Sequence, residues 1–180
     1  MNTGMNRKKL VTLACGACFL PPLPQRPAPP PLLKSHDIHS IGVEVTNVSE
    51  THHLDPSDLA QSVVGKLNSN PRSAGIKADA GREAGPEDAV LKVVILSESA
   101  TSASNPANRN GQQWTIFVNL SATITRNEGR EVWRESDGAY RLSRFFQEQD
   151  PVAVWKEPFV PYWVSWRLDN RLLLAPVPNQ

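Results

Sequence analysis

The strictest pattern in the sequence is an alternation of apolar and polar side chains near the middle of the chain. Every second position over residues 114–124 is apolar, and threonine, serine and asparagine occupy most positions between; the apolar set is Trp114, Ile116, Val118, Leu120, Ala122 and Ile124. Because successive side chains of a β-strand point to opposite faces of a sheet, a period of two predicts a strand with one buried face. The rest of the chain therefore has to cover one face of a sheet.

Other segments extend this sheet. Residues 38–45 alternate in the same way, and residues 74–79 are expected to add a short strand. Residues 89–96 are apolar on both faces apart from one lysine, which is typical of a central strand. A glycine-containing turn precedes an expected return strand over residues 130–136. The polar residues 97–113 predict a long, mobile hairpin loop, which is a candidate contact element because loops on a rigid sheet commonly carry recognition.

A helix is expected between the first two strands. Asp55 can cap its start and Pro56 suits the first helical position. Apolar residues then recur at helical spacing, at Leu59, Val63, Val64 and Leu67. The order of elements predicts the α+β class: a small antiparallel or mixed sheet of four to five strands with one or two helices packed on one face. The simplest arrangement is an antiparallel meander with the helix on one face. One helix covers such a sheet poorly, so a second is expected after residue 147.

The last part of the chain conflicts with that expectation. Pro158 and Pro161 interrupt residues 155–166, a stretch that also holds three tryptophans. Proline costs a helix interior about 3 kcal/mol, so a continuous helix is not expected there. Three interpretations stay open: a remodelled cover for the sheet, an apolar segment that docks on a barrel wall or membrane surface, or a shifted reading frame in the gene.

The start of the chain predicts a targeting signal. A basic stretch at residues 7–9 is followed by a short apolar run and by small residues, the pattern of a secretory signal. Gly16-Ala17 before Cys18 suits the cleavage rule of bacterial lipoproteins, which makes Cys18 the expected lipid attachment site. Cys15 is the alternative site, and a plain signal peptide is the alternative without lipid. Seven of the 16 prolines then fall within residues 21–31, which predicts an extended polyproline spacer.

These patterns divide the chain into four parts. Residues 1–18 are expected to be a lipoprotein-type signal peptide, and residues 19–33 a proline-rich linker. Residues 34–147 are expected to form the α+β domain. Residues 148–180 form an atypical tail rich in aromatic residues and proline.

Composition excludes several functional classes. The net charge of +1 gives no case for nucleic-acid binding, and no apolar run reaches the roughly 18 to 20 residues of a membrane-spanning helix. No cysteine follows Cys18. No convergent third ligand accompanies the histidines, and no phosphate loop or nucleophile motif is present; the histidines are His36, His39, His52 and His53. We therefore expect neither an enzyme nor a cofactor nor a metal site.

Four segments together resemble LptE, the family of lipopolysaccharide-assembly lipoproteins of the outer membrane. They are the opening KSHDIHSIGV at residues 34–43, the later Asn47, the strand entry EDAVL at residues 87–91, and EVW at residues 131–133 after a glycine turn. The resemblance lies in their order and spacing, and it covers residues 34–147 plus the lipoprotein-like start.

The resemblance implies a role without catalysis and without a cofactor. Proteins of this family are anchored by lipid on the periplasmic face of the outer membrane. They sit as a plug inside the β-barrel LptD, help to assemble it and help to deliver lipopolysaccharide to the cell surface. The alternative function is that of a periplasmic lipoprotein acting as adaptor or activator of an envelope enzyme; an envelope hydrolase has no supporting set of residues.

Arginines of the last hairpin and its exit are candidate lipopolysaccharide contacts, because guanidinium groups pair well with the phosphates of lipid A. They are Arg126, Arg130, Arg134, Arg141 and Arg144. Acidic residues are interleaved with them, at Glu128, Glu131, Glu135 and Asp137. A mixed, solvated face is therefore the alternative interpretation.

The lipid assignment predicts the outcome of a labelling experiment. Labelled palmitate fed to cells that express the full chain is expected to enter the protein, and the label should vanish in Cys18→Ala. Persistence of label in Cys18→Ala together with its loss in Cys15→Ala would move the site to Cys15. Absence of label from the unmodified chain would contradict the lipoprotein assignment.

Overall fold

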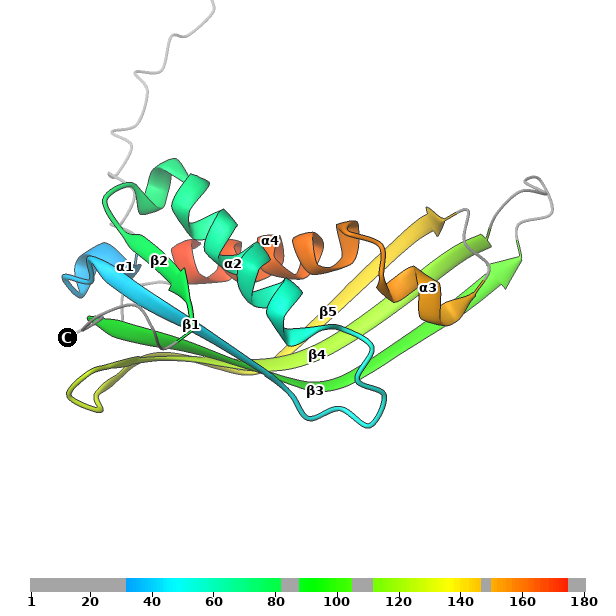
Figure 1. The fold of residues 1–180 in the computed structure, drawn as a ribbon, viewed down its shortest axis with the longest axis horizontal. Helices are drawn as coiled ribbons and strands as arrows, with labels where there is room; N and C mark the ends of the chain where they lie inside the picture. Colours follow the sequence, from blue (N-terminus) through cyan, green and yellow to red (C-terminus); the bar gives the residue numbers. More distant parts are fainter. Residues whose placement is uncertain (1–31, 82–87, 105–111, 147–149, 175–180) are drawn as a thin grey trace, which may run out of the picture.

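A computed structural model describes residues 32–81, 88–104, 112–146 and 150–174 of the chain. Two long helices lie on one side of a five-stranded sheet (Figure 1). In chain order the elements are α1 (Leu32–Ser35), β1 (Ser40–Asn47), α2 (Pro56–Ser69), the short 3-10 helix η1 (Pro71–Ser73), β2 (Lys77–Ala80), β3 (Ala89–Ser104), β4 (Gln112–Arg126), β5 (Glu131–Phe146), α3 (Pro151–Trp155) and α4 (Phe159–Leu174).

The sheet is mixed, with strand order β2-β1-β3-β4-β5. β1 lies between β2 and β3 and runs parallel to both, whereas β3, β4 and β5 are antiparallel neighbours. The α+β class with a small sheet and helices on one face is thus confirmed. The simple antiparallel meander is wrong for the first strands, because α2 carries the chain back across the sheet and so returns it parallel to β1.

The predicted alternation on β4 matches its burial. All six apolar residues over 114–124 are buried, and they face the helices. Ile41 and Val43 of β1 are also buried, and Leu91, Val93 and Ile95 of β3 complete this side of the sheet. The core therefore lies in a single layer between the sheet and the helices above it.

β3 continues far beyond its apolar part. The expected loop over residues 97–113 is wrong for residues 97–104, which pair with β4 as regular strand, and for residues 112 and 113, which begin β4. Residues 105–111 lie outside the described residues. A register shift falls between Ile95 and Ser97, so the inward positions of β3 change from odd to even numbers there. That shift turns Glu98 into the interior.

The C-terminal part of the chain forms α4 and covers the sheet. A helical stripe is buried against the core: Val160, Trp163, Val164, Leu168 and Leu172. The second helix expected from the width of the sheet is confirmed, whereas the expected interruption by proline is wrong. Pro158 precedes the helix and Pro161 lies in its first turn, where the backbone N–H has no partner within the helix. Of the three interpretations, the structure supports the cover for the sheet.

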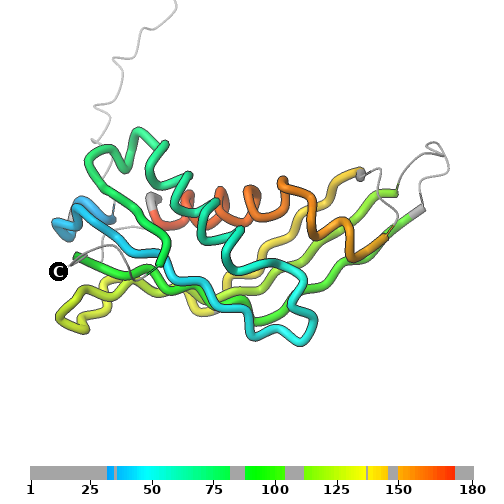
Figure 2. Tube along the Cα trace, in the orientation of Figure 1, coloured from blue at the N-terminus to red at the C-terminus, as the bar shows by residue number. Residues whose placement is uncertain are grey.

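The two ends of the described chain meet. Leu32 and Leu33 of α1 are buried, and α1 contacts α4 (Figure 2).

A carboxylate joins the start of β1 to the start of β3. Asp88, which directly precedes β3, accepts bonds from the N–H groups of His39 at 2.8 Å and Ser40 at 3.0 Å. These bonds hold the pKa of Asp88 below its usual value. Asp88 therefore ties the entry of β3 to the entry of β1.

The start of α2 follows the sequence closely. Asp55 caps the helix by accepting bonds from the N–H groups of Ser57 at 2.7 Å and Asp58 at 3.1 Å, and Pro56 takes the first helical position. Leu59, Ala60, Val63 and Leu67 are buried, and Val64 is partly buried against the core. The predicted helix is thus confirmed from its cap to its apolar stripe.

A carboxylate is buried where α2 meets α4. Asp169 of α4 is 5% exposed, and its Oδ2 accepts a bond from Asn70 Nδ2 at 2.8 Å. Its Oδ1 has no hydrogen-bond partner among the described residues. Burial raises the pKa of Asp169, and the Asn70 bond and the charges of Lys66 and Arg72 oppose the rise. The ionised form is therefore disfavoured in the folded chain.

This environment predicts a pH-dependent gain for Asp169→Asn. Since the folded-state pKa lies above the ordinary aspartate value, ionisation of Asp169 costs stability as the pH rises through that value of about 3.9. The variant is expected to melt a few degrees above the unmodified chain near neutral pH, with a gain that shrinks towards pH of about 4. Thermal melts of both proteins across this range measure it, with the exposed Glu128→Gln as control. A lower melting temperature for Asp169→Asn near neutral pH would contradict the assignment.

Candidate functional site

The predicted lipid attachment site cannot be placed in the fold. Cys18 and the alternative Cys15 lie outside the described residues, as does the proline-rich linker up to residue 31. Lipidation at Cys18 therefore stays a prediction. None of the helices in the described part of the chain has both the length and the apolar character that crossing a membrane requires.

The five candidate arginines do not form one cluster. Arg126 donates to the backbone carbonyl of His36 at 3.0 Å, and Arg130 is exposed in the turn between β4 and β5. The guanidinium of Arg144 lies 3.9 Å from the ring centroid of Phe159, on the helix side of the sheet.

Arg126 and Arg130 meet at the turn between β4 and β5, where the Arg126 N–H donates to the Arg130 carbonyl at 2.9 Å. Arg134 and Arg141 stand seven residues apart on the edge strand β5, on the side of the sheet away from the helices. Arg134 is paired there with Glu131 through two bonds, which also lower the pKa of Glu131. Part of the arginine set thus matches the alternative of a mixed, solvated face, and the lipopolysaccharide contacts stay a prediction.

The side of the sheet away from the helices is uncovered within the described residues (Figure 1). We call its outward side chains on β4 and β5 the open face: Thr115, Phe117, Asn119, Ser121, Thr123, Arg134, Arg141 and Ser143. The Thr115 and Ser143 hydroxyls lie 3.1 Å apart, and the Arg141 guanidinium lies 5.6 Å from the ring centroid of Phe117, which is 40% exposed. This face presents hydroxyl, amide and guanidinium groups on a rigid surface.

A buried carboxylate organises the segment between β1 and α2. Glu98 accepts bonds from Asn47 Nδ2 at 3.0 Å and Thr51 Oγ1 at 3.1 Å. It also accepts bonds from the backbone N–H groups of His53 at 2.7 Å and Leu54 at 3.0 Å. The Ser49 hydroxyl is a fifth donor, at 3.0 Å. Because Glu98 stands on β3, these five donors attach the segment to the sheet.

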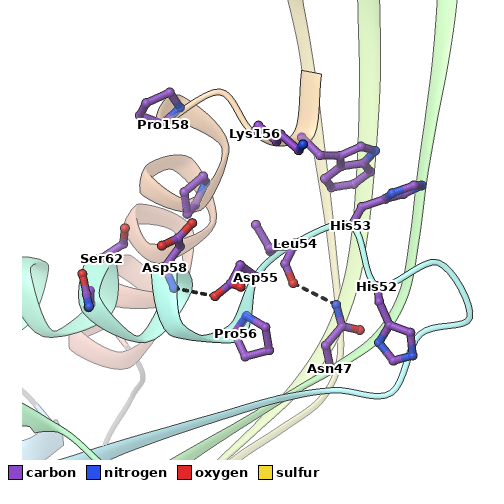
Figure 3. Close-up of a pocket in the computed structure, with 13 residues that line it drawn as sticks. Asn47, His52, His53, Leu54, Asp55, Pro56, Asp58, Ser62, Lys156 and Pro158 are labelled. Atoms are coloured by element: carbon purple, nitrogen blue, oxygen red, sulfur yellow. Dashed lines mark hydrogen bonds between the residues drawn. The ribbon is translucent and has the colours of Figure 1, made fainter. Parts of the chain in front are cut away.

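The attached segment forms one wall of a cleft of about 900 Å³ (Figure 3). The start of α2 and the junction of α3 with α4 form the other walls. The His53 ring stacks on Trp155, with ring centroids 5.5 Å apart and an angle of 18° between the planes. The cleft is therefore a shaped concavity with a rigid aromatic wall.

The cleft gathers histidines and carboxylates without making a metal centre. Among the residues with described positions, no three His, Cys, Asp or Glu side chains converge on one point. The other two histidines do not line the cleft. His39 Nε2 lies 3.0 Å from Asp37 Oδ1 on the surface, and His36 Nε2 is buried without a hydrogen-bond partner among the described residues. Neither arrangement supplies the three protein ligands of a catalytic zinc site.

Sequence reasoning missed three side chains: Glu98, which holds the wall of the cleft, and Arg167 and Arg171 of α4, which lie beside β5. The polar sequence predicts a loop around Glu98, because a register shift has no signature in composition. Arg167 and Arg171 fall in the tail for which no continuous helix is expected, although their spacing of four residues places them on one side of α4. That spacing was the available signal, and the two prolines obscured it.

Comparison with known proteins gives likeness in arrangement and no family. No protein-family model matches the chain, and no curated protein is similar to it in sequence. A solved structure from Xanthomonas campestris, of the DUF330 family, shares 14% identity over 76% of this chain and 84% of that chain, with a TM-score of 0.48.

Two solved lipoprotein structures are similar to the same extent. A minor lipoprotein of Acinetobacter baumannii shares 10% identity over 76% of this chain and 93% of its own, with a TM-score of 0.43. Lipoprotein B of Nitrosomonas europaea shares 11% identity over 76% and 83%, with a TM-score of 0.43.

The Glu98 arrangement predicts a large effect on stability. Glu98→Ala leaves the five donors without this acceptor, so it is expected to lower the free energy of unfolding by about 2 to 4 kcal/mol. Glu98→Gln keeps one acceptor oxygen and should lose less. Urea unfolding measures both, with the exposed Glu128→Ala as a control expected to change by less than about 0.5 kcal/mol. An effect of Glu98→Ala no larger than that of the control would contradict the role given to Glu98.

Proposed function

We propose that this chain is an LptE-like lipoprotein of the outer membrane, attached by lipid at Cys18 on the periplasmic face. In this proposal it plugs and helps to assemble an LptD-type β-barrel and assists lipopolysaccharide transport to the cell surface. The observation that carries the proposal is the open face: a long, regular sheet surface lined by polar side chains, opposite a fully built core.

The chemistry of the open face suits a polar cavity. An antiparallel sheet with one solvated face normally alternates apolar and polar residues, as β4 does. The lumen of a wide transmembrane barrel is polar, so hydroxyl and amide groups on a rigid sheet can bind its wall without burying unpaired groups. Because the core lies on the other side, contacts on the open face leave the fold intact.

The start of the chain supplies the attachment that the proposal needs. The spacer over residues 21–31 would reach roughly 34 Å if fully extended, at about 3.1 Å per residue. A tether of that length lets a body anchored by one lipid stand away from the membrane surface and enter a barrel. We propose no catalytic step and no cofactor.

One observation favours the alternative, an adaptor or activator of an envelope enzyme. Tyr162 and Trp166 of α4 are 48% and 43% exposed, and the Lys66 ammonium lies 3.6 Å from the ring centroid of Tyr162. Tyrosine and tryptophan are enriched in protein interfaces. This surface lies on the helix layer, so variants there and on the open face separate the two functions.

A pull-down tests the proposal. Tagged mature protein, recovered from detergent-solubilised outer membrane, is expected to bring down a large, heat-modifiable β-barrel. Ser121→Lys combined with Thr123→Lys places two long cations on the open face and should abolish recovery of the barrel. The matched control, Gln61→Lys, adds a cation to the exposed face of α2 and should leave recovery unchanged.

Two results would contradict the proposal. One is recovery of a peptidoglycan enzyme without a barrel. The other is equal recovery of the barrel by the open-face variant and by the control, provided that thermal melts show all proteins folded.

A further inference from the structure

β2 pairs with only the first half of β1. The four residues of β2 lie beside residues 40–43, and the last bond runs from the Gly81 N–H to the Val43 carbonyl at 3.4 Å. Gly81 has a φ of +92°, in the left-handed region, which ends the strand there. Residues 45–47 pair with β3 and have no strand on their other side within the described residues, and we call that side the outer edge of β1.

Backbone groups at the outer edge lack partners in the described part of the chain. Odd-numbered residues of β1 turn their N–H and C=O groups toward β2, as the bond accepted by Val43 shows. The next even position past the strand turns toward β3, since the Val48 N–H donates to the Ile95 carbonyl at 3.0 Å. The N–H and C=O of Val45 and the N–H of Asn47 therefore point to the outer edge, where no described residue bonds them. Donors and acceptors at this spacing match an extended polypeptide backbone.

A groove of about 640 Å³ follows the outer edge. Residues 43–46 of β1 form one wall, and Pro56, Ser57 and Ala60 of α2 form the other. The end of β2 closes the groove on one side, and α2 lies over both β1 and β2 (Figure 1). The groove thus lies where β2 would continue, between a strand edge and a helix.

The sequence of β2 indicates which side chains fit under α2. Ala78 of β2 points toward the helix and is 1% exposed, and Ala60 of α2, at the groove wall, is 8% exposed. Inward positions of a strand that continued β2 would also face α2, so they favour small side chains. Outward positions would lie beside the Glu44 carboxylate, which already attracts Lys92 at 3.8 Å. Basic or polar side chains suit those positions, because opposite charges on neighbouring strands stabilise a sheet.

We propose that the outer edge of β1 binds an extended segment of a partner polypeptide, which adds a strand to the sheet beneath α2. The segment carries small apolar residues at alternate positions, with polar or basic residues between them. Main-chain hydrogen bonds to Val45 and Asn47 supply the affinity, and the groove wall at Ala60 selects the inward side chains. Addition of a strand to a sheet edge is a recurring mode of peptide recognition.

This proposal goes beyond the proposed function, because it uses a different surface. The outer edge of β1 contains no residue of the open face, which lies on β4 and β5. A failed pull-down of the barrel would leave the outer edge unchanged. Absence of peptide binding would likewise leave the open face and its barrel partner unaffected.

A designed peptide tests the outer edge. The probe is acetyl-TAKATAK-amide, in which alanine alternates with threonine and lysine, and the control peptide acetyl-AAATTKK-amide has the same composition without the alternation. An NMR titration of the isotope-labelled mature protein is expected to give a dissociation constant below about 1 mM for the probe and no saturation for the control. Hydrogen exchange of the Val45 and Asn47 amides should slow when the probe binds.

Two protein variants locate the bound peptide. Val45→Pro removes one donor and should weaken binding about tenfold, since an edge proline loses its N–H without breaking the ladder to β3. Ser57→Trp puts a large side chain at the exposed rim of the groove and should weaken binding at least as much. Its matched control, Ser69→Trp at the exposed end of α2, should bind like the unmodified protein.

Saturable binding of the probe, with slower exchange at Val45 and Asn47 and a loss specific to Ser57→Trp, supports the proposal. Where thermal melts show that Val45→Pro does not fold, Ser57→Trp decides the result. Absence of binding by the folded, unmodified protein would overturn the proposal, as would equal weakening by Ser69→Trp. Sedimentation that shows a dimer of the unmodified protein, dissociated by Ser57→Trp and not by Ser69→Trp, would assign the edge to a second copy of this chain and overturn it as well.

Discussion

The rest of the structure depends on the burial of one face of a single sheet. β4 supplies six buried side chains to that face, and its neighbour β3 and the next strand, β1, extend the apolar surface on one side. Burial of apolar area is the dominant favourable term in folding, so the helices have to follow this surface. α2 and α4 cover it together, and the polar groups of the open face are left for contacts outside the fold.

Patterns that local chemistry decides could be predicted from the sequence. The β4 alternation and the Asp55 cap with Pro56 each depend on neighbours within a few residues. The parallel placement of β1 and the register shift at Ile95 depend on which strands pair, and composition does not record pairing. Pro161 was misleading because a proline is harmful inside a helix and harmless in its first turn.

The candidate sites show the same division. Arg134 and Arg141 could be selected because guanidinium groups recognise phosphate wherever they occur. Arg167 and Arg171 of α4 could not, since the two prolines obscured the helical spacing of this segment and both residues lie beside β5 only in the folded chain. Glu98 was hidden for a related reason, because its burial follows from a shift of one residue in strand pairing.

A bulge in β5, opposite residues 120–122 of β4, also affects how the protein associates with other extended chains. β5 is a long strand at the edge of the sheet, and such an edge offers unpaired backbone groups to any other extended chain. One extra residue between Glu135 and Gly138 interrupts the regular spacing of those groups, and Arg134 and Arg141 on either side carry repelling charge. The bulge and these charges thereby protect the protein from aggregation along its exposed edge.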